Sequence, residues 1–343
     1  DGPQCRGRAG ARAGHAAAIR IALNKACRPV IHRVKAIDPL RLRLFADKVD
    51  QAYGVGADRR EDLRLHDAVV RTAGRFHLIA HAHRLAFCRL RKALACHGNP
   101  VHPNKEIAAK FHEEFVDAMK IAVLLGTDTV IGFSGCPGDC EASQNTNWVT
   151  CAWPNEYLDI LNWQWNEVLI PYWKKTGAFA KEHGVDHIAF EMHPGFCVYN
   201  PATLLRLREA VGDVIGANFD PSHLIWQGMD VVAAIRELKG AIYHVHAKDT
   251  KIDKYNTARN GVLDVKHYGD ELERSWIFRT VGYGNGEDYW REIVSNLRLV
   301  GYDHVLSIEH EDSLMSQNEG LSKAVEMLQR VLIKENPAEM WWA

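Results

Sequence analysis

The sequence predicts an α/β fold whose parallel strands close into a (β/α)8 barrel, and two observations lead to this prediction. From about Leu94 onward, apolar segments alternate with helical segments roughly every 25–35 residues, a spacing typical of parallel strands joined by crossover helices. Four successive strands also end in a residue that can bind a metal ion: Glu191, Asp220, His246 and Glu309. An open, doubly wound sheet would spread these residues over about 15 Å. A closed barrel gathers strand ends at one mouth and is therefore favoured.

Each predicted strand is a short apolar or β-branched run that ends in a loop signal. The run Thr129–Phe133, for example, is followed by Ser134-Gly135-Cys136-Pro137-Gly138-Asp139, which is typical of a loop. In chain order, the predicted strands cover residues 94–96, 129–133, 187–191, 214–220, 241–246 and 305–309. Because the strand bodies are apolar, the polar residues at their ends are expected at the carboxyl-terminal mouth of the sheet.

Helices are predicted between these strands from apolar spacing and capping residues. Asn104 is a suitable N-cap, and Gly126 ends the helix that follows. The apolar residues of this helix recur at helical spacing: Ile107, Phe111, Phe115, Met119 and Ala122. Further helices are predicted over residues 157–183, 201–210, 230–238, 287–297 and 321–333. A loop-rich insertion of about forty residues separates His246 from the helix near Glu287, and its spaced glycines, 282–286, predict a flexible site loop.

The first part of the chain has a different composition. Residues 1–98 contain 20 basic and 8 acidic residues, whereas all ten tryptophans lie from Trp148 onward. An ordinary or poorly ordered region, or a shifted reading frame in GC-rich codons, would explain the excess of Ala, Arg, Gly and His. We therefore expect an atypical region over residues 1–90, a barrel domain over 91–335 and a tail over 336–343. No catalytic residue is expected in 1–90, and Ala68–Val70 and Phe76–Ile79 are weak candidates for the first two barrel strands.

Overall composition excludes several classes of protein. A net charge of −1 argues against nucleic-acid binding, which rests on excess positive charge. No run approaches the roughly 18 apolar residues of a membrane span, and the first residues lack the pattern of a secretory signal. The eight cysteines are therefore expected to be reduced thiols. These observations predict a soluble, cytoplasmic protein.

The four strand-end residues suit a divalent cation. Carboxylates favour Mg²⁺ or Mn²⁺, and an imidazole nitrogen moves the preference toward Mn²⁺, Co²⁺ or Zn²⁺. Taken singly, each residue has a structural interpretation: Asp220 before Pro221 can form a turn, and His246 can be a hydrogen-bonded core residue. Their coincidence at four successive strand ends favours a metal site.

Four motifs around these residues carry a family resemblance. They are Phe190-Glu191-Met192-His193-Pro194-Gly195, Asn218-Phe219-Asp220-Pro221-Ser222-His223-Leu224, His244-Val245-His246-Ala247-Lys248-Asp249 and Ser307-Ile308-Glu309-His310-Glu311-Asp312. They resemble the sugar phosphate isomerase/epimerase family, whose fold is a xylose isomerase-like TIM barrel. The resemblance covers about residues 94–333 and includes Cys96-His97-Gly98-Asn99-Pro100.

The resemblance implies a metal-dependent isomerase or epimerase of carbohydrate metabolism. It implies that Glu191, Asp220, His246 and Glu309 bind one divalent cation, with Mn²⁺ expected first and Mg²⁺ or Co²⁺ as alternatives. Glu191 and Glu309 would also be the catalytic pair, transferring a proton through a metal-stabilised cis-enediolate of a sugar or sugar phosphate.

Five further residues are candidates for substrate binding: His223, Lys248, His193, Arg279 and His97. His223 matches the family histidine that hydrogen-bonds substrate oxygens. Lys248 is either a clamp on developing negative charge or a solvated lysine, and His193 contacts substrate or is structural. Some family epimerases have an arginine six residues after the histidine ligand, where this chain has Ile252, so Arg279 would supply the guanidinium from the insertion.

Two other functions stay open. The first is a lyase or dehydratase acting on a keto-sugar or keto-inositol, similar to inosose dehydratases or to enzymes that cleave 3-oxo-glycosides. The second is a non-catalytic sugar-binding subunit. Phosphodiester hydrolysis is disfavoured because Asp264 and His267 lack the spacing of the zinc ligands in related endonucleases. The expected partner is a small-molecule substrate, with no nucleic acid and no membrane, and a homo-oligomer stays open.

Overall fold

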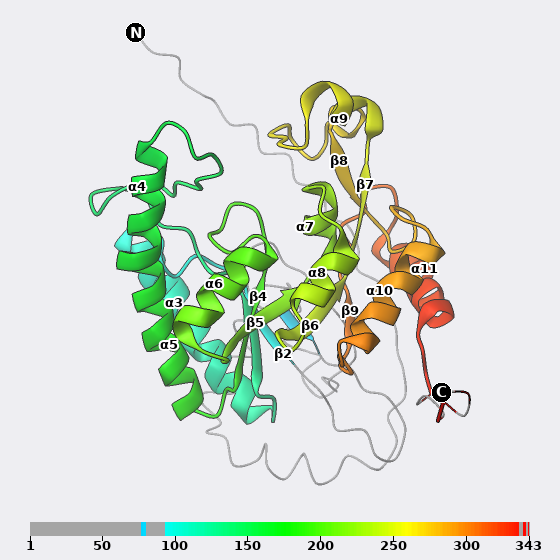
Figure 1. Ribbon diagram of the computed structural model, residues 1–343, viewed down its shortest axis with the longest axis horizontal. Helices are drawn as coiled ribbons and strands as arrows, with labels where there is room; N and C mark the ends of the chain where they lie inside the picture. Colours follow the sequence, from blue (N-terminus) through cyan, green and yellow to red (C-terminus); the bar gives the residue numbers. More distant parts are fainter. Residues whose placement is uncertain (1–76, 80–92, 336–338, 341, 343) are drawn as a thin grey trace, which may run out of the picture. The chain divides into compact units, whose positions relative to one another are not determined.

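A curved sheet of seven strands is the central element of the described part of the chain (Figure 1). The computed structural model describes residues 77–79, 93–335, 339–340 and 342, and the statements below concern these residues. The sheet has the order β1-β2-β3-β4-β5-β6-β9. Its strands are β1 (His77–Ile79), β2 (Ala93–Cys96), β3 (Thr129–Gly132), β4 (His187–Glu191), β5 (Ile215–Phe219), β6 (Ile242–Ala247) and β9 (Leu306–Ile308). From β2 to β9 all neighbouring pairs are parallel, as the alternating pattern predicts.

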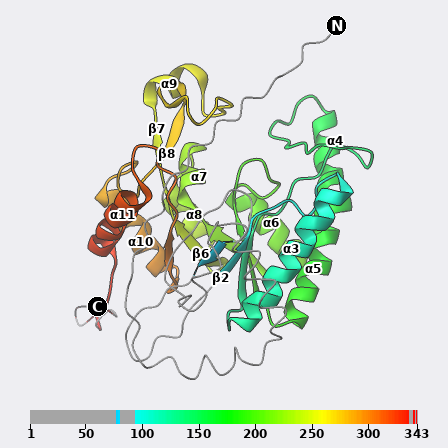
Figure 2. The same ribbon diagram turned by 180° about the vertical axis from the view of Figure 1, so that it is seen from behind.

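Most helices lie on the outer side of this sheet, whereas α9 lies beyond it, beside the strands β7 (Asp249–Ile252) and β8 (Trp276–Arg279) (Figure 2). The helical elements of the described residues are α3 (Lys105–Leu124), α4 (Glu156–Trp163), a π-helical segment (Gln164–Leu169), α5 (Ile170–Glu182), α6 (Pro201–Val211), α7 (Pro221–Trp226), α8 (Val231–Glu237), α9 (Lys254–Asn260), a 3₁₀ turn (Glu271–Glu273), α10 (Glu287–Leu299) and α11 (Gln317–Val331). Within the described residues, no helix combines the length and the apolar character that crossing a membrane requires.

Local sequence determines where several helices begin. The Asn104 side chain accepts hydrogen bonds from the backbone N–H groups of Glu106 and Ile107, at 3.0 and 3.3 Å, which confirms the predicted N-cap of α3. Asn200 and Thr203 cap the start of α6 reciprocally. The predicted helix over 157–183 is instead divided by the π-helical segment. Pro171, in the first turn of α5, cannot donate a backbone hydrogen bond, so the regular pattern is interrupted just before it.

Two parts of the fold differ from what the sequence predicts. The loop-rich insertion after His246 also contains secondary structure that was not predicted, because β7 (Asp249–Ile252) and β8 (Trp276–Arg279) form an antiparallel pair with α9 between them. Of the two weak candidates for early barrel strands, Phe76–Ile79 overlaps β1, which pairs with β2 antiparallel and so is no parallel barrel strand. Ala68–Val70 lies outside the described residues. The boundaries at residues 90 and 335 stay predictions.

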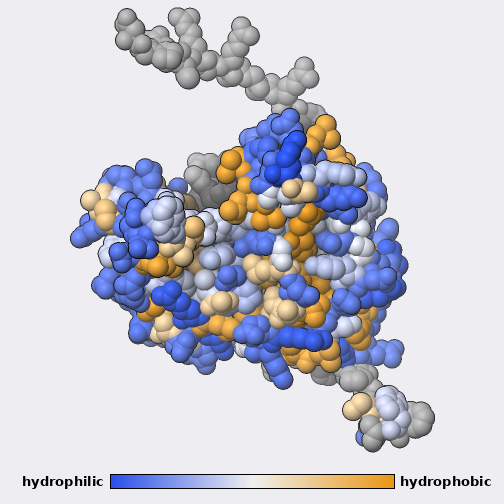
Figure 3. Space-filling model, turned by 45° about the horizontal axis from the view of Figure 1, so that its top comes forward, coloured by the Kyte–Doolittle hydropathy of each residue, from blue (hydrophilic) through white to orange (hydrophobic). Residues whose placement is uncertain are grey.

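The inserted hairpin is held by aromatic packing on one side. The Trp276 ring of β8 stacks on Trp226 of α7, with ring centroids 4.5 Å apart and planes 5° from parallel. In the segment between β7 and β8, several apolar side chains are exposed, among them Val265 and Leu272. Figure 3 shows such apolar side chains interspersed with polar ones on the face that it presents. The stacked indoles therefore fix the hairpin to the barrel helices.

A β-bulge in β6 sets which side chains face the barrel interior. Ala217 pairs with Ile242 and Asn218 with His244, so Tyr243 is an extra residue between the two pairs. The Tyr243 ring packs against the small interior cluster of Ala95, Ile131 and Ala189. Gly216 leaves room for that ring, because a Cβ at residue 216 would lie 2.2 Å from Tyr243 Cε2. The bulge thus turns His244 to the same side as Asn218, and His246 two residues later faces that side as well.

We expect Gly216→Ala to destabilise the protein by about 1–3 kcal/mol, because the added methyl group overlaps the Tyr243 ring and the Ala241 carbonyl. Ordinarily, replacing glycine in a strand by alanine is favourable by roughly 0.5–1 kcal/mol, so the sign of the change is diagnostic. Thermal and denaturant unfolding of the full chain would measure it. Gly286→Ala is the matched control, since a Cβ there meets no atom within 4 Å. Equal stability of the two variants would contradict the role assigned to Gly216.

Candidate metal centre

Four predicted side chains meet at the carboxyl-terminal mouth of the sheet. Glu191 is the last residue of β4, Asp220 follows β5, His246 lies near the end of β6 and Glu309 follows β9. All four are buried, and one ligand atom from each lies within 4.8 Å of the others. In a flat sheet, three strand spacings of about 4.8 Å would separate the ends of β4 and β9 by roughly 14 Å. The curvature of the sheet therefore brings the four side chains together, as the barrel prediction requires.

The His246 imidazole lies between the two glutamates. Its Nδ1 is 3.2 Å from Glu191 Oε2 and 3.0 Å from Glu309 Oε2, and 3.9 Å from Asp220 Oδ2. In the sheet order, β5 and β6 separate the strands of the glutamates. Glu191 and Glu309 thus approach the cluster from opposite ends of a row of four.

The charges of the cluster depend on one another. Burial lowers the pKa of His246, but contacts with Glu191 and Glu309 outweigh it and raise this pKa to about 10. Burial raises the pKa of Glu191, but hydrogen bonds from His223, His246 and His97 outweigh it and hold that pKa well below its ordinary value. In Asp220 burial prevails and raises the pKa to about 7, against the lowering effect of Lys248. Positive charge at the centre of the cluster is therefore what keeps the glutamates ionised.

The residues fit a divalent cation. Asp220 Oδ1 accepts a hydrogen bond from the Ser222 backbone N–H at 2.8 Å, which orients the carboxylate. Its Oδ2 has no hydrogen-bond partner among the described residues, although His223 Nε2 is 3.4 Å away. Three buried carboxylates and one imidazole are ligands that Mn²⁺, Mg²⁺, Co²⁺ and Zn²⁺ accept, and their combined negative charge demands a cation. With His246 deprotonated, this set is suited to hold one.

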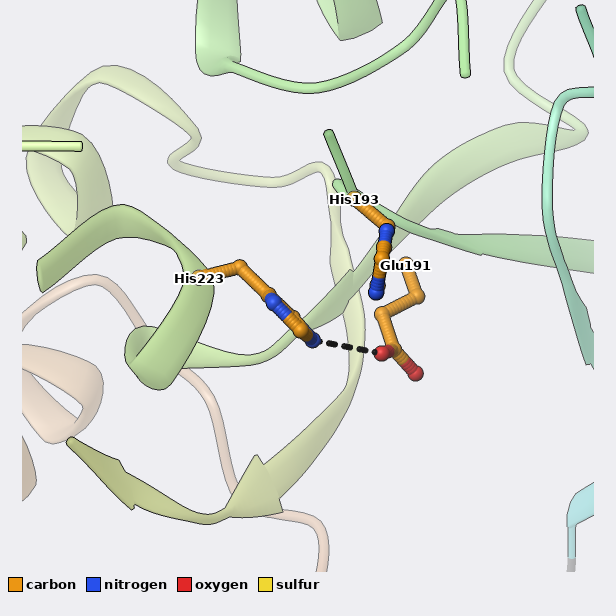
Figure 4. Close-up of side chains that lie close together, drawn as sticks. All are labelled: Glu191, His193 and His223. Carbon is orange, nitrogen blue, oxygen red and sulfur yellow. Dashed lines mark hydrogen bonds and ion pairs between the residues drawn. The ribbon is translucent and has the colours of Figure 1, made fainter. Parts of the chain in front are cut away.

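Three of the predicted substrate-binding histidines surround Glu191. His223 Nε2 lies 3.0 Å from Glu191 Oε1, and His97 Nε2 lies 3.6 Å from Glu191 Oε2. Figure 4 shows His193 and His223 turned toward Glu191, and their ring centroids are 4.1 Å apart. Burial lowers the pKa of His193 to about 3, so its imidazole is neutral. The structure therefore brings these three histidines to the predicted site.

Lys248 is also part of the site. Its ammonium group is buried and lies 3.4 Å from Glu309 Oε1 and 2.5 Å from Glu311 Oε2, and it sits over the Phe278 ring at 4.2 Å. The alternative of a solvated lysine is therefore wrong. Burial raises the pKa of Glu309, but Lys248 and His246 outweigh it and keep this carboxylate ionised.

The structure does not bring Arg279 to the cluster. Neighbouring residues of a strand point to opposite faces, and in β8 it is Phe278 that contacts Lys248 and His223. The Arg279 guanidinium instead lies 3.1 Å from Glu271 Oε2 and 3.3 Å from Asp312 Oδ1. Its charge is therefore already compensated on the other side of the hairpin.

The sequence analysis missed two polar residues of the site. The Asn218 side-chain amide donates to Glu191 Oε2 at 3.2 Å and lies 3.2 Å from His246 Nδ1. Glu311 pairs with Lys248. Both stand two residues from a predicted ligand, so the alternation of strand side chains was the signal that could have found them.

The glycine-containing loop that follows β8 is hydrogen-bonded to Asp249, and the flexibility predicted for this loop stays a prediction. The buried carboxylate of Asp249 accepts hydrogen bonds from the backbone N–H groups of Gly282, Gly284 and Asn285, and from the Trp290 indole at 3.1 Å. Asp249 directly follows Lys248 in the chain. These hydrogen bonds therefore connect the loop to β7, the strand that begins directly after Lys248.

The comparisons with known proteins agree with this fold. A family model described as a xylose isomerase-like TIM barrel matches residues 55–331. The chain therefore belongs to the family of xylose isomerase-like TIM barrel proteins. It is 43% identical over 243 residues to "Uncharacterized protein YfiH" of Bacillus subtilis (strain 168). The aligned region covers 70% of this chain and 77% of that protein.

Two further relatives have names that describe a biological role. The chain is 35% identical over 130 residues to the rhizopine catabolism protein MocC of Rhizobium meliloti, covering 38% of each protein. It is 25% identical over 142 residues to an inosose dehydratase of Clostridium perfringens, covering 38% of this chain and 47% of that enzyme. These matches are partial and extend over less than half of either relative.

Solved structures also resemble the chain. A D-tagatose 3-epimerase-like protein is 21% identical with a TM-score of 0.47, and the alignment covers 69% of this chain and 77% of that one. The IOLI protein with a bound zinc atom is 17% identical with a TM-score of 0.46, covering 70% and 75%. At these identities the likeness says nothing about substrate.

We expect Asp220→Asn to lower the affinity for Mn²⁺ by more than about 10-fold. Even residues that only hydrogen-bond to a metal ligand typically change metal affinity by about 10- to 100-fold when they are replaced, and a ligand itself should matter at least as much. Mass spectrometry of metal content, after loading with Mn²⁺ and desalting, would measure it, with about one ion per chain in the wild type. The exposed Asp288→Asn is the control for loss of one negative charge. Equal metal content in all three proteins would contradict the assignment.

Proposed function

We propose that the chain is a divalent-metal-dependent isomerase or epimerase that transfers a proton beside the carbonyl group of a sugar or sugar phosphate. The observation that supports this most directly is the position of Glu191 and Glu309 at opposite ends of the buried row, with Asp220 and His246 between them. Two carboxylates on opposite sides of one substrate carbon can remove a proton from one face and return it to the other.

The four residues Glu191, Asp220, His246 and Glu309 would hold the cation. A divalent cation there would polarise the substrate carbonyl and acidify the neighbouring carbon-bound hydrogen. Both glutamates are ionised in the structure and can act as bases. Glu309 is steadied by Lys248, and Glu191 by His223 and Asn218, so each carboxylate has a fixed orientation for proton transfer.

The outcome depends on where the proton returns. If it returns to the same carbon on the opposite face, the product is an epimer. If it returns to the adjacent carbon, an aldose and a ketose interconvert. In both cases His223 and His97, which lie beside Glu191, would hydrogen-bond substrate hydroxyl groups.

Dehydration is a second candidate function, and the named relatives support it. Two of them are a rhizopine catabolism protein and an inosose dehydratase. The same proton would be removed first. The hydroxyl group on the next carbon would then accept a proton and leave as water. The first step is shared, so the same glutamates would serve both reactions.

Deuterium exchange tests the shared step. We expect the Mn²⁺-loaded chain, in D₂O with a panel of ketoses, ketose phosphates and inososes, to place deuterium on carbon in at least one compound, as measured by NMR. Glu309→Gln should slow this exchange by about 10²–10⁴-fold, the usual contribution of a general base. Asp288→Asn is the control.

The product mass separates the candidates. An unchanged elemental composition supports isomerisation or epimerisation, and loss of one water supports dehydration. A sugar-binding subunit would bind a compound from the panel equally well in wild type and Glu309→Gln, with no exchange in either. That outcome would overturn the enzymatic proposal.

A further inference from the structure

We propose that Glu191, His193 and His223 form a second cation site beside the metal-ligand cluster, and that this site takes Zn²⁺ or a divalent ion with the same preference for nitrogen ligands. The inference goes beyond the proposed function, which needs only the first cation. It is carried by the distances within this trio of side chains, by the hydrogen bond that orients His193, and by the way in which the Glu191 carboxylate is shared between the trio and the cluster.

The trio comes from the ends of two neighbouring strands. Glu191 is the last residue of β4, His193 follows two residues later, and His223 lies in α7, which follows β5. One ligand atom from each of the three lies within 4.8 Å of the others, and His223 Nε2 is 3.0 Å from Glu191 Oε1. The ligand atoms around a tetrahedral Zn²⁺ are about 3.4 Å apart. The trio therefore has nearly the dimensions of a zinc site.

The His193 ring is oriented as a metal ligand. Its Nδ1 lies 2.5 Å from the carbonyl oxygen of Pro194, and because a carbonyl only accepts, Nδ1 is the donor. In the neutral ring the lone pair is then on Nε2. Figure 4 shows the end of the ring that is farther from the main chain turned toward Glu191 and His223. Histidines that bind metal ions usually donate their other ring N–H in this way, which fixes the tautomer.

The two oxygens of the Glu191 carboxylate have different partners. Oε2 lies 3.2 Å from His246 Nδ1 and accepts a hydrogen bond from the Asn218 amide, whereas Oε1 lies 3.0 Å from His223 Nε2. A carboxylate shared in this way can bridge two cations, which in two-metal sites lie about 3.5–4 Å apart. The buried Asp220 Oδ2 atom, without a hydrogen-bond partner in the described part of the chain, lies 3.4 Å from His223 Nε2 and 3.9 Å from His246 Nδ1. This oxygen can therefore contact a cation on either side.

The charge of the region also favours a second cation. Four carboxylates lie in or beside the cluster, those of Glu191, Asp220, Glu309 and Glu311. When all are ionised, Lys248 and one divalent cation still leave one negative charge, in a place where water screens it poorly. A second divalent cation that carries a bound hydroxide would bring the region to neutrality.

The two cation sites differ in the metal that they prefer. Two imidazoles and one carboxylate are a ligand set that Zn²⁺ uses in catalytic sites, where its fourth position stays open to water or to a substrate oxygen. The cluster instead supplies three carboxylates and one imidazole, a set that Mn²⁺ and Mg²⁺ accept. Loading with Zn²⁺ and loading with Mn²⁺ are therefore expected to give different stoichiometries.

Metal content tests this expectation. The full chain, freed of metal, is loaded with Zn²⁺ alone or with Mn²⁺ alone, desalted, and measured by mass spectrometry. We expect about two Zn²⁺ but only about one Mn²⁺ per wild-type chain. His193→Gln should lose about one Zn²⁺ and keep its Mn²⁺, because it removes a ligand of the second site only. His183→Gln is the matched control, because His183 is exposed, stacks on Phe179 and precedes β4, whereas Glu191 ends that strand.

A titration with Co²⁺ tests whether the two sites are adjacent. Co²⁺ accepts the ligands of both sites and is paramagnetic. Two Co²⁺ ions bridged by Glu191 would be magnetically coupled, so the EPR signal per ion should fall when the second equivalent binds to the wild type. His193→Gln, with one Co²⁺, should keep the signal of an isolated ion. Two ions held far apart would instead give signals that add.

The outcomes separate this inference from the proposed function. One Zn²⁺ per wild-type chain, equal Zn²⁺ content in His193→Gln and His183→Gln, or additive Co²⁺ signals in the wild type would each overturn the inference. The wild-type measurements do not depend on whether a variant folds. Two Zn²⁺ per chain, with no deuterium exchange by the Mn²⁺-loaded protein, would support the inference and overturn the proposed function. Exchange by a chain that holds only one Zn²⁺ would do the reverse.

Discussion

The mutual repulsion of three buried carboxylates is the constraint on which the rest of this site depends. Glu191, Asp220 and Glu309 meet within a few ångströms of one another, where water cannot screen their charges. Such a group is stable only when positive charge and hydrogen-bond donors reach it from several directions. His246 and Lys248 supply the charge, and the amide of Asn218 adds a donor. The same demand for positive charge is what makes the cluster a suitable site for a divalent cation.

The fold meets this demand through the shape of the sheet. Curvature brings the ends of β4 and β9 together, and the bulge at Tyr243 turns His244 to the interior side that His246 shares. Gly216 permits that bulge, because a side chain there would displace the Tyr243 ring. After the end of β6, the hydrogen bonds between Asp249 and the glycine-containing loop hold β7, the strand that begins just after Lys248. Backbone features far from the chemistry thus position the charges.

Membership of the family indicates a type of chemical step, whereas the side chains around the cluster determine which substrate and product are preferred. Under the proposed function, the four ligand-type residues would serve one chemical step, proton removal beside a carbonyl group, which isomerisation, epimerisation and dehydration all share. Discrimination among these outcomes must come from the groups that contact the rest of the substrate. In this chain the side chains beside the metal-ligand cluster include His97, His193 and the Lys248–Glu311 pair, and these residues lie outside the strands of the sheet. Loops vary more readily than strands, so they are where a substrate preference is expected to be encoded.

The sequence by itself determined the parallel strands β2, β3, β4, β5, β6 and β9 with most of the helices between them, the capping of α3 by Asn104, and the four residues that meet at the mouth of the barrel. Local patterns suffice for these features, because alternation, helical spacing and strand ends are properties of neighbouring residues. Only the tertiary structure decided that the insertion forms a hairpin, that Lys248 is buried against Glu311, and that Arg279 points away from the cluster while Phe278 faces it. These outcomes depend on which residues distant in the chain pack against each strand face, and on the bulge that sets its register. No local pattern carries that information, since it arises from long-range packing and from the balance of buried charges.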